Sequence, residues 1–296
     1  MERRHLQYFL AVSDEGSISA AARSLRLSQP SVSQAIQELE SELECQLFVR
    51  GRGMTLTSGG RALIGPARAA LRALDAARWA AASITELRSG DLDIGSVVHL
   101  AVDPLVGLLA DYRVRHPGIR IRVSSVGAGS RGFDALSRGD IEILLGEYPP
   151  PATGYQVTPM GHREVMVVCP PGTPLPDRPF RLEETQSRDW IAALTPGVYG
   201  RKHLNDLLVE RGLNELVPVL ETAHRHSIVP LVLAGVGSAM LSRAEAETAA
   251  SLGAVIRPLD ADIPTGYALY HRPDNLSPAA RAFVVQTRQH GENANL

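Results

Sequence analysis

Residues 17–47 constrain this chain more than any other segment, because they encode two short helices separated by a tight turn. Gly16 is suited to end a preceding helix in a left-handed conformation, and Ser17 is suited to cap the first of the two. The apolar residues of that helix recur at helical spacing: Ile18, Ala21, Ala22 and Leu25. We expect this stripe to pack against a neighbouring element, as in a helix-turn-helix.

The second helix is predicted to follow the turn at residues 26–28, with Ser28 as its cap and Pro30 in its first turn, where a missing N–H has no cost. Its buried stripe is expected to comprise Val32, Ile36, Leu39 and Leu43. Its opposite face carries hydroxyls and amides: Gln29, Ser31, Ser33, Gln34 and Gln37. Such groups are suited to base edges in the major groove of DNA. The alternative interpretation is an ordinary solvated face.

A hairpin is predicted next, with strands at residues 47–49 and 54–56 around a Gly-punctuated turn. The turn carries Arg50 and Arg52, whose guanidinium groups are suited to phosphate. Since it directly follows the second helix, we interpret it as a wing that contacts the DNA backbone. A merely solvated basic turn is the alternative.

Residues that match one known family recur in order through this region: His5, Leu6, Gln7, Tyr8, Phe9, Leu10, Ala11, Val12, Gly16, Ser17, Ala21, Ala22, Leu25, Ser28, Gln29, Pro30, Ser33, Ile36, Leu39, Glu40, Leu43, Leu47, Phe48, Arg50, Leu56 and Thr57. With this series the N-terminal part resembles the LysR-type transcriptional regulators. Later features of the chain fit the same family.

The resemblance implies an α+β multidomain fold: an N-terminal winged helix-turn-helix, a long linker helix and a C-terminal two-lobed α/β sensor like the periplasmic binding proteins. The predicted parts are a DNA-binding domain at 1–57, a linker and dimerisation helix at 58–90, and an effector-binding domain at 91–296, with its first lobe at 91–161 and 267–296 and its second at 162–266. It further implies a regulator of transcription that binds double-stranded DNA as a dimer or tetramer and responds to a small effector between the lobes. Activation and repression both stay open.

The chain departs from the family pattern in two ways. Glu44 stands where the family usually has Gly, which puts the expected left-handed helix stop in doubt. Residues 29–49 contain no Lys or Arg, although the family often has basic residues there. The predicted DNA contacts are Arg4, Arg23, Ser28, Gln29, Pro30, Ser31, Ser33, Gln34, Gln37, Arg50 and Arg52. We expect modest affinity for each site, with several domains acting together.

Charge alone does not indicate a nucleic-acid partner, because the net charge of the 296 residues is −2. Residues 1–88 carry 11 Arg and 9 acidic residues, whereas the remainder carries 19 basic and 23 acidic residues. The DNA prediction therefore depends on the motif and the placement of its arginines.

No signal peptide or membrane span is visible, because the N-terminus leads into a charged amphipathic helix and Pro230 and two glycines interrupt the apolar run at 228–241. We therefore expect a cytoplasmic protein. Cys45 and Cys169 are isolated and lack metal-type spacing, so we interpret both as small apolar residues. No metal or cofactor is expected.

Residues 58–88 are typical of one long helix rich in Ala and Arg. Its apolar stripe comprises Leu63, Ala67, Ala70, Leu74, Ala77, Ala81, Ile84 and Leu87. A helix this long with little to cover it favours pairing with its copy in a second chain. Pro66 is expected to bend the helix or lie near its start.

Strand-like runs alternate with helical stretches after residue 91. The predicted strands and helices lie at 92–95, 105–116, 119–123, 132–138, 141–146, 165–168, 190–194, 202–211, 217–221, 228–234, 239–241, 267–270 and 278–289. The alternation favours parallel β-sheet in an α/β domain. The resemblance implies that this domain has two α/β lobes, with the chain crossing between them near Gly161 and Gly266.

Ligands in open α/β sheets lie beyond the carboxyl ends of strands, so the loops after the predicted strands are candidate effector contacts. The candidates are His99, Gly127, Ala128, Gly129, Ser130, Glu147, Thr195, Tyr199, His224 and His226. Backbone N–H groups at a helix start after Gly127 suit a carboxylate or phosphate, so the effector is expected to be a carboxylate or another anion. His99 matches a family position that often carries a hydroxyl.

Other interpretations compete for the same residues. Residues 127–132 match a dinucleotide fingerprint, but they follow the second strand of their lobe instead of opening a nucleotide-binding unit. His224 and His226 would point to one side of a strand and suit a metal together with His99, without a carboxylate or thiolate set. No nucleophile elbow occurs, which disfavours an enzyme. A metabolite-binding protein or enzyme that uses its helix-turn-helix only for dimerisation is the rival hypothesis.

Overall fold

A computed structural model describes residues 1–51, 53–82, 89–127, 129–148, 153–194, 199–261, 263, 265–273 and 276–294. The helices of the N-terminal part are α1 (Arg3–Glu15), α2 (Ile18–Leu25), α3 (Gln29–Glu42) and α4 (Ser58–Ala82). The later helices are α5 (Val98–Val102), α6 (Leu105–Arg115), α7 (Ser130–Ser137), α8 (Tyr199–Glu210), α9 (Ile228–Leu233), α10 (Arg243–Ser251) and α11 (Pro278–Ala294), with 3-10 helices η1 (Leu182–Ser187) and η2 (Arg225–Ser227). The strands are β1 (Phe48–Gly51), β2 (Gly53–Leu56), β3 (Gly90–Ser96), β4 (Ile119–Ser125), β5 (Ile143–Glu147), β6 (Gln156–His162), β7 (Val165–Cys169), β8 (Ile191–Ala193), β9 (Leu220–Thr222), β10 (Ala239–Ser242), β11 (Val255–Pro258) and β12 (Gly266–His271).

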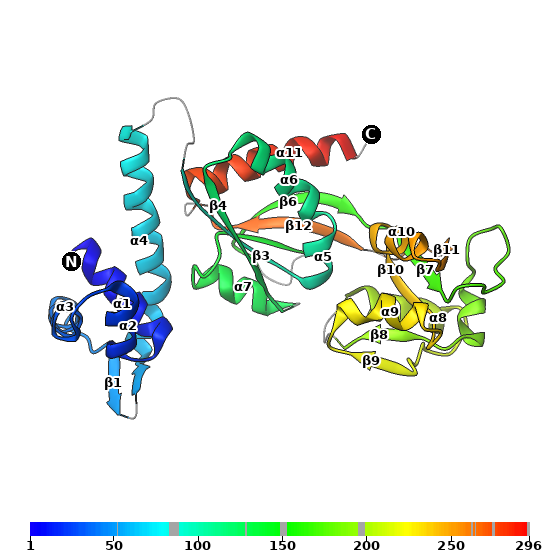
Figure 1. Ribbon diagram of the computed structural model, residues 1–296, viewed down its shortest axis with the longest axis horizontal. Helices are drawn as coiled ribbons and strands as arrows, with labels where there is room; N and C mark the ends of the chain where they lie inside the picture. The colour runs from blue at the N-terminus through cyan, green and yellow to red at the C-terminus, as the bar shows by residue number, and fades with distance from the viewer. Residues whose placement is uncertain are drawn as a thin grey trace.

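The molecule is elongated, with helices α1–α4 at one end and two sheet-containing lobes following along its long axis (Figure 1). We call the part around β3, β4, β5, β6 and β12 the first lobe, and the part around β7–β11 the second lobe. The second lobe lies at the end opposite the N-terminal helices (Figure 1).

The N-terminal part forms the predicted helix-turn-helix around one apolar core. Gly16 ends α1 with φ of 66°, and the Ser17 side chain caps α2 by accepting a hydrogen bond from the Ala20 N–H. Ser28 caps α3 in the same way. The core comprises Leu6, Phe9, Val12, Ala21, Ala22, Val32, Ile36, Leu39, Leu47, Phe48, Ile64 and Ala67. Both caps and most of the predicted stripes are therefore confirmed.

The end of α3 differs from the prediction. The helix stops at Glu42, so Leu43 is its C-cap and is 37% exposed; its predicted burial is wrong. Glu44 takes the left-handed conformation with φ of 50°, and the Cys45 N–H donates to the Glu40 carbonyl at 3.1 Å. The left-handed stop thus occurs here with glutamate in place of glycine, because this backbone bond closes the helix.

The wing is an antiparallel hairpin of β1 and β2, joined directly to α4. Thr57 donates its hydroxyl to the Gln46 carbonyl at 2.7 Å and accepts from the Gly60 N–H at 3.0 Å. A Cβ at Gly60 would lie 2.2 Å from the Leu47 carbonyl oxygen, so only glycine permits this close junction. Helix α4 continues past Pro66, which lies inside the helix.

The first lobe is built on a five-stranded sheet in the order β4-β3-β5-β12-β6. Strand β3 is parallel to β4 and β5, as predicted, but β12 is antiparallel to both β5 and β6. Helix α11 packs against β3 and β6, and Tyr112 of α6 donates its hydroxyl to the Ala279 carbonyl at 2.8 Å. The sheet is therefore mixed, and the parallel prediction holds only for three of its strands.

The second lobe contains a three-stranded sheet in the order β10-β7-β11 that is antiparallel throughout, contrary to the predicted parallel sheet. The reason is that α10 carries the chain from β10 to β11, and β7 lies between them in the opposite direction. Parallel strands β8 and β9 adjoin this sheet through a bridge between Trp190 and Ser238. Strand β9 begins at Leu220, later than the predicted 217, because Pro218 cannot join a ladder.

Helix α4 also contacts the first lobe of the same chain, at residues 137–142. Arg72 donates to the Gly139 carbonyl at 3.1 Å and lies 3.5 Å from the Glu142 carboxylate. Arg68 forms ion pairs with Asp14 of α1, at 3.1 Å, and with Asp140. These contacts join the helix-turn-helix, the linker helix and the first lobe.

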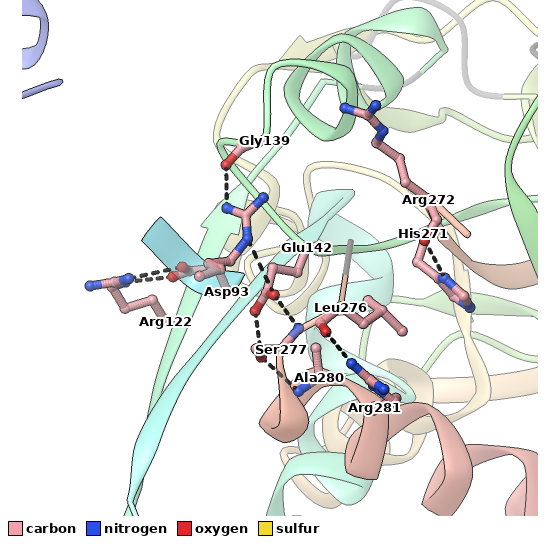
Figure 2. Close-up of polar contacts among 11 residues, drawn as sticks. Asp93, Arg122, Gly139, Glu142, His271, Arg272, Leu276, Ser277, Ala280 and Arg281 are labelled. Carbon is pink, nitrogen blue, oxygen red and sulfur yellow. Dashed lines mark hydrogen bonds and ion pairs between the residues drawn. The ribbon is translucent and has the colours of Figure 1, made fainter. Parts of the chain in front are cut away.

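The Glu142 carboxylate is held at the start of α11 by Ser277, as Figure 2 shows. Its oxygens accept hydrogen bonds from the Ser277 N–H at 2.8 Å and the Ser277 hydroxyl at 3.0 Å. Burial raises the pKa of Glu142, whereas the Ser277 N–H and Arg72 act to lower it. The same hydroxyl accepts from the Ala280 N–H, so Glu142 and Ser277 together cap α11.

Candidate functional site

The N-terminal end of α3 presents the polar surface that the sequence predicts. Gln29, Pro30, Ser31, Gln34 and Gln37 are exposed, and Ser33 is half-buried. The Ser19 hydroxyl of α2 donates to the Gln29 side chain at 3.1 Å, which orients that amide. The Ser28 and Ser31 hydroxyls lie 2.7 Å apart. These groups form one continuous surface at the start of the helix.

The C-terminal half of α3 has a different electrostatic character. Gln34 donates its amide N–H to Glu38 at 2.9 Å, so only its carbonyl oxygen is fully available to another molecule. Glu38 also lies 3.2 Å from the buried His5 ring. Glu40 accepts hydrogen bonds from the backbone N–H groups of Leu47, at 2.7 Å, and Phe48. A carboxylate of α3 therefore fixes the base of the wing.

Only two of the four arginines predicted to contact DNA have side chains among the described residues. Arg23 is exposed at the last turn of α2, and Arg4 is exposed but pairs with Glu2 at 2.9 Å. The Arg50 side chain and Arg52 lie outside the described residues.

A cavity of about 170 Å³ lies where the first lobe, the crossing segments and the second lobe meet. His99 of α5 lines it from the first lobe, Arg163 and Thr265 from the two crossings, and Arg201 and Arg225 from the second lobe. The crossings are tied together, since the Arg163 N–H donates to the Thr265 carbonyl at 3.2 Å. Its remaining lining residues are Glu164, Val165, Trp190, Ile191, Ala192, Ala193, Leu204, Leu216, Ile228, Met240, Leu241, Ser242 and Ile263.

The three arginines of the cavity differ in how their charges are balanced. Arg225 forms a two-point contact with Glu245, at 3.1 and 2.7 Å, and Arg201 pairs with Glu221. In the part of the chain that the structure describes, no ion pair involves Arg163, and its Nε atom is buried without a hydrogen bond. Burial and the nearby Arg225 lower the pKa of Arg163, whereas Glu245, Glu147 and Asp103 act to raise it.

His99 is a neutral group at the edge of this cavity. Burial, with Arg163 and Arg225 nearby, lowers its pKa to about 3. Its Nε2 atom lies 3.6 Å from the Glu147 carboxylate, which is too long for a hydrogen bond. At neutral pH the imidazole is therefore uncharged, and this contact is not an ion pair.

The other predicted effector residues are not brought together at this cavity. Gly127, Gly129 and Glu147 line a separate void of about 10 Å³. Ser130 is exposed in the first turn of α7. Ala128, Thr195 and the Tyr199 side chain lie outside the described residues.

His224 and His226 are exposed, with ring centroids 5.7 Å apart. The prediction that they point to one side of a strand is wrong, because residues 225–227 form the 3-10 helix η2 and β9 has already ended at Thr222. The turn directs Arg225, which lies between them, toward the cavity.

Two family models match this chain and together cover nearly all of it. Residues 3–61 match the bacterial regulatory helix-turn-helix protein, lysR family, and residues 85–292 match the LysR substrate binding domain. The chain belongs to the LysR family. This LysR-family protein is thus a DNA-binding transcriptional regulator with an effector-binding domain, as the sequence predicts.

Curated relatives align with this LysR-family regulator along almost its whole length. The HTH-type transcriptional regulator AlsR of Bacillus subtilis is 25% identical over 96% of this chain and 94% of its own. The uncharacterized HTH-type transcriptional regulator YeiE of Escherichia coli is 30% identical over 95% of both chains. These relatives are transcriptional regulators and not enzymes.

Solved structures of full-length proteins share the fold. Full-length BenM aligns with a TM-score of 0.58 and 25% identity, covering 100% of this chain and 98% of its own. CbnR complexed with its target DNA aligns with a TM-score of 0.67 and 19% identity, covering 98% and 100%. Because the identity to CbnR is only 19%, this second likeness supports the fold and nothing further.

The α3 surface and the cavity are the two candidate sites. In the described ranges no group of three or more His, Cys, Asp or Glu residues is placed to hold a metal ion. Among the helices that the structure describes, none has the length and apolarity needed to cross a membrane. The effector contacts predicted from the sequence did not include Arg163, Arg201 or Arg225.

The lowered pKa of His99 predicts an acid-dependent loss of stability. The unfolded chain binds a proton at His99 below about pH 6.5, whereas the folded chain binds it only near pH 3, so stability falls as the pH falls through this range. The expected loss is roughly 1.4 kcal/mol for each pH unit from about 6 to about 4. Urea unfolding of the wild type and of His99→Gln at several pH values checks this; an equal pH dependence in both would contradict it.

Proposed function

We propose that the start of α3 reads DNA bases through neutral side chains, with Gln29 and Ser33 making the principal contacts and Ser28, Pro30, Ser31, Gln34 and Gln37 around them. The observation that carries this proposal is the exposed polar surface at the N-terminal end of a capped helix, next to a hairpin wing. Recognition helices of this class place their N-terminal residues against base edges. Arg4, Arg23, Arg50 and Arg52 supply the phosphate contacts in this proposal.

Two or more copies acting together complete the proposal. Ile64 and Ala67 of α4 pack on the helix-turn-helix, whereas Leu74 is 44% exposed and Ala77 is also exposed. This exposed part of the linker helix, within the predicted 58–90, supports pairing with a second chain. Two recognition helices would then enter successive major grooves about 34 Å apart.

We further propose that an anionic effector in the 170 Å³ cavity controls DNA binding through the first lobe. Strand β5 runs from the Glu142 contact with α4 to Glu147, which lies beside His99 at the cavity. Movement of the lobes around an effector therefore shifts residues 137–142 against Arg68 and Arg72. Such a change acts on DNA binding only if the effector favours one arrangement of the lobes.

The proposed regulator acts in the cytoplasm, where its DNA partner lies, and it has no catalytic role. The rival hypothesis, a metabolite-binding protein with a helix-turn-helix used only for dimerisation, makes the opposite prediction for variants of α3.

Substitution of Gln29 and Ser33 by Ala is expected to weaken DNA binding by at least tenfold while leaving the fold intact. Each bidentate base contact contributes about 1–3 kcal/mol of discrimination, and neither side chain belongs to the core. Fluorescence anisotropy, on a duplex selected by the wild-type chain from random sequences, measures the change. Ser41→Ala, exposed in the last turn of the same helix, is the matched control and is expected to bind like the wild type. Unchanged binding by the double variant would remove α3 as the reading helix.

A further inference from the structure

The charges around the cavity identify what its ligand must supply. Arg225 and Arg201 are already neutralised by Glu245 and Glu221. Arg163 lies on the crossing segment between β6 and β7. Glu245, Glu147 and Asp103 act on it electrostatically, but its buried Nε atom has no hydrogen-bond partner among the described residues. A buried guanidinium with an unsatisfied N–H group is costly, and charge-assisted hydrogen bonds are stronger than neutral ones, so this position favours an anionic acceptor on a bound molecule.

A hydrogen-bonding group accompanies that cation. The His99 side chain is 8% exposed, and its Nε2 atom has no hydrogen-bond partner in the described part of the chain. Because burial and the guanidinium groups of Arg163 and Arg225 lower its pKa, His99 adds no second positive charge at neutral pH. With its proton on Nε2, the neutral ring is able to donate to an oxygen atom in the cavity.

The remaining wall is mainly apolar. Trp190 and Leu204 are 3% and 5% exposed, and Met240, Leu241 and Ile263 extend the same wall. The volume of about 170 Å³ is more than ten times the roughly 10–15 Å³ that a cavity needs to hold one water. An apolar body of modest size fits this space, whereas a second charge would be desolvated against carbon.

We infer that the cavity binds a small organic monocarboxylate, with the carboxylate at Arg163 and His99 and an apolar body against Trp190 and Leu204. The inference rests on the proposed function, since it names the chemical class of the effector. A neutral molecule of the same shape offers the Arg163 guanidinium only a weaker, uncharged acceptor. A dicarboxylate places its second carboxylate against the apolar wall, where it loses its hydration.

Isothermal titration of the full chain with matched probes tests this. Benzoate is compared with benzamide and phthalate, and hexanoate is compared with hexanamide and adipate. At least one monocarboxylate is expected to bind at least tenfold more tightly than its amide and its dicarboxylate counterpart. Tighter binding of an amide or a dicarboxylate would overturn the inference, as would the absence of monocarboxylate binding at millimolar concentration.

Variants locate the binding site. Arg163→Gln is expected to weaken monocarboxylate binding at least tenfold, and to fold as well as the wild type because it removes a buried guanidinium with an unsatisfied Nε atom. Arg211→Gln, exposed on the same lobe, is the matched control and is expected to bind within twofold of the wild type. Ala193→Phe fills the cavity without changing any charge and is expected to abolish binding. Retained affinity in both cavity variants would contradict the assignment.

DNA binding measured in parallel separates this inference from the proposed function. If the chain selects a duplex but binds no monocarboxylate, the monocarboxylate assignment fails and the proposal for α3 stands. If it binds a monocarboxylate but selects no duplex, the proposal for α3 fails.

Discussion

Glu142→Ala is expected to lower the stability of the first lobe by about 3–5 kcal/mol, the typical effect of removing one partner from a buried ion pair. The Glu142 side chain is 1% exposed and the side chain of its partner Arg72 is 17% exposed. The substitution removes the larger of the two negative charges, on Glu142 and Asp93, that act on the Arg72 guanidinium. It also removes the acceptor for two hydrogen bonds from Ser277 at the start of α11 (Figure 2).

Differential scanning calorimetry of the full chain measures this effect, which should appear as a fall of the sensor transition on the order of 10 °C. Glu210→Ala, on the exposed end of α8, is the control and should change the stability by less than about 0.5 kcal/mol. Glu142→Gln keeps a carbonyl oxygen for Ser277 and is expected to fall between the two. A Glu142→Ala transition equal to that of Glu210→Ala would show that this contact contributes little.

Phe9→Ala is expected to destabilise the helix-turn-helix by about 3–5 kcal/mol and to abolish DNA binding. Phe9 is 0% exposed, and the centroid of its ring lies 5.5 Å from the centroid of the Phe48 ring. Phe9 therefore joins α1 to the wing. A domain this small has few other apolar contacts to compensate, and its total stability is of similar size.

The same calorimetry, together with anisotropy on the selected duplex, checks the Phe9 prediction. Leu43→Ala is the control in this domain, because Leu43 is 37% exposed and its truncation should cost less than about 1 kcal/mol. Wild-type affinity for the duplex in Phe9→Ala would contradict the prediction.

The helix-turn-helix could be predicted closely because its determinants are local. Caps at Ser17 and Ser28, the glycine at the end of α1 and the 3.6-residue period each act within a few residues of sequence. The predicted burial of Leu43 was wrong because it depends on where α3 stops. That stop is set by a backbone bond to Glu40, which the apolar pattern does not reveal.

The cavity was harder to predict, because its groups come together only through the crossing of the two lobes. The expectation that ligands bind in the loops after strands identified His99. The same expectation selected the Gly127 loop, which lines a different void. Arg163 lies in the short crossing between β6 and β7, and that expectation does not extend to crossings between lobes. Its one signal is its place in the polar segment 162–164, directly before the apolar run at 165–169.

The coupling of the two sites is tested most directly by measuring the affinity for the selected duplex with and without a saturating monocarboxylate. The account predicts that the Kd for DNA changes by about fivefold or more, and that DNA changes the Kd for the monocarboxylate by the same factor, as linkage requires. The monocarboxylate identified by titration is the ligand, and Arg163→Gln, in which the effect should vanish at the same concentration, is the control. A DNA affinity that stays the same while the monocarboxylate is bound would contradict the account.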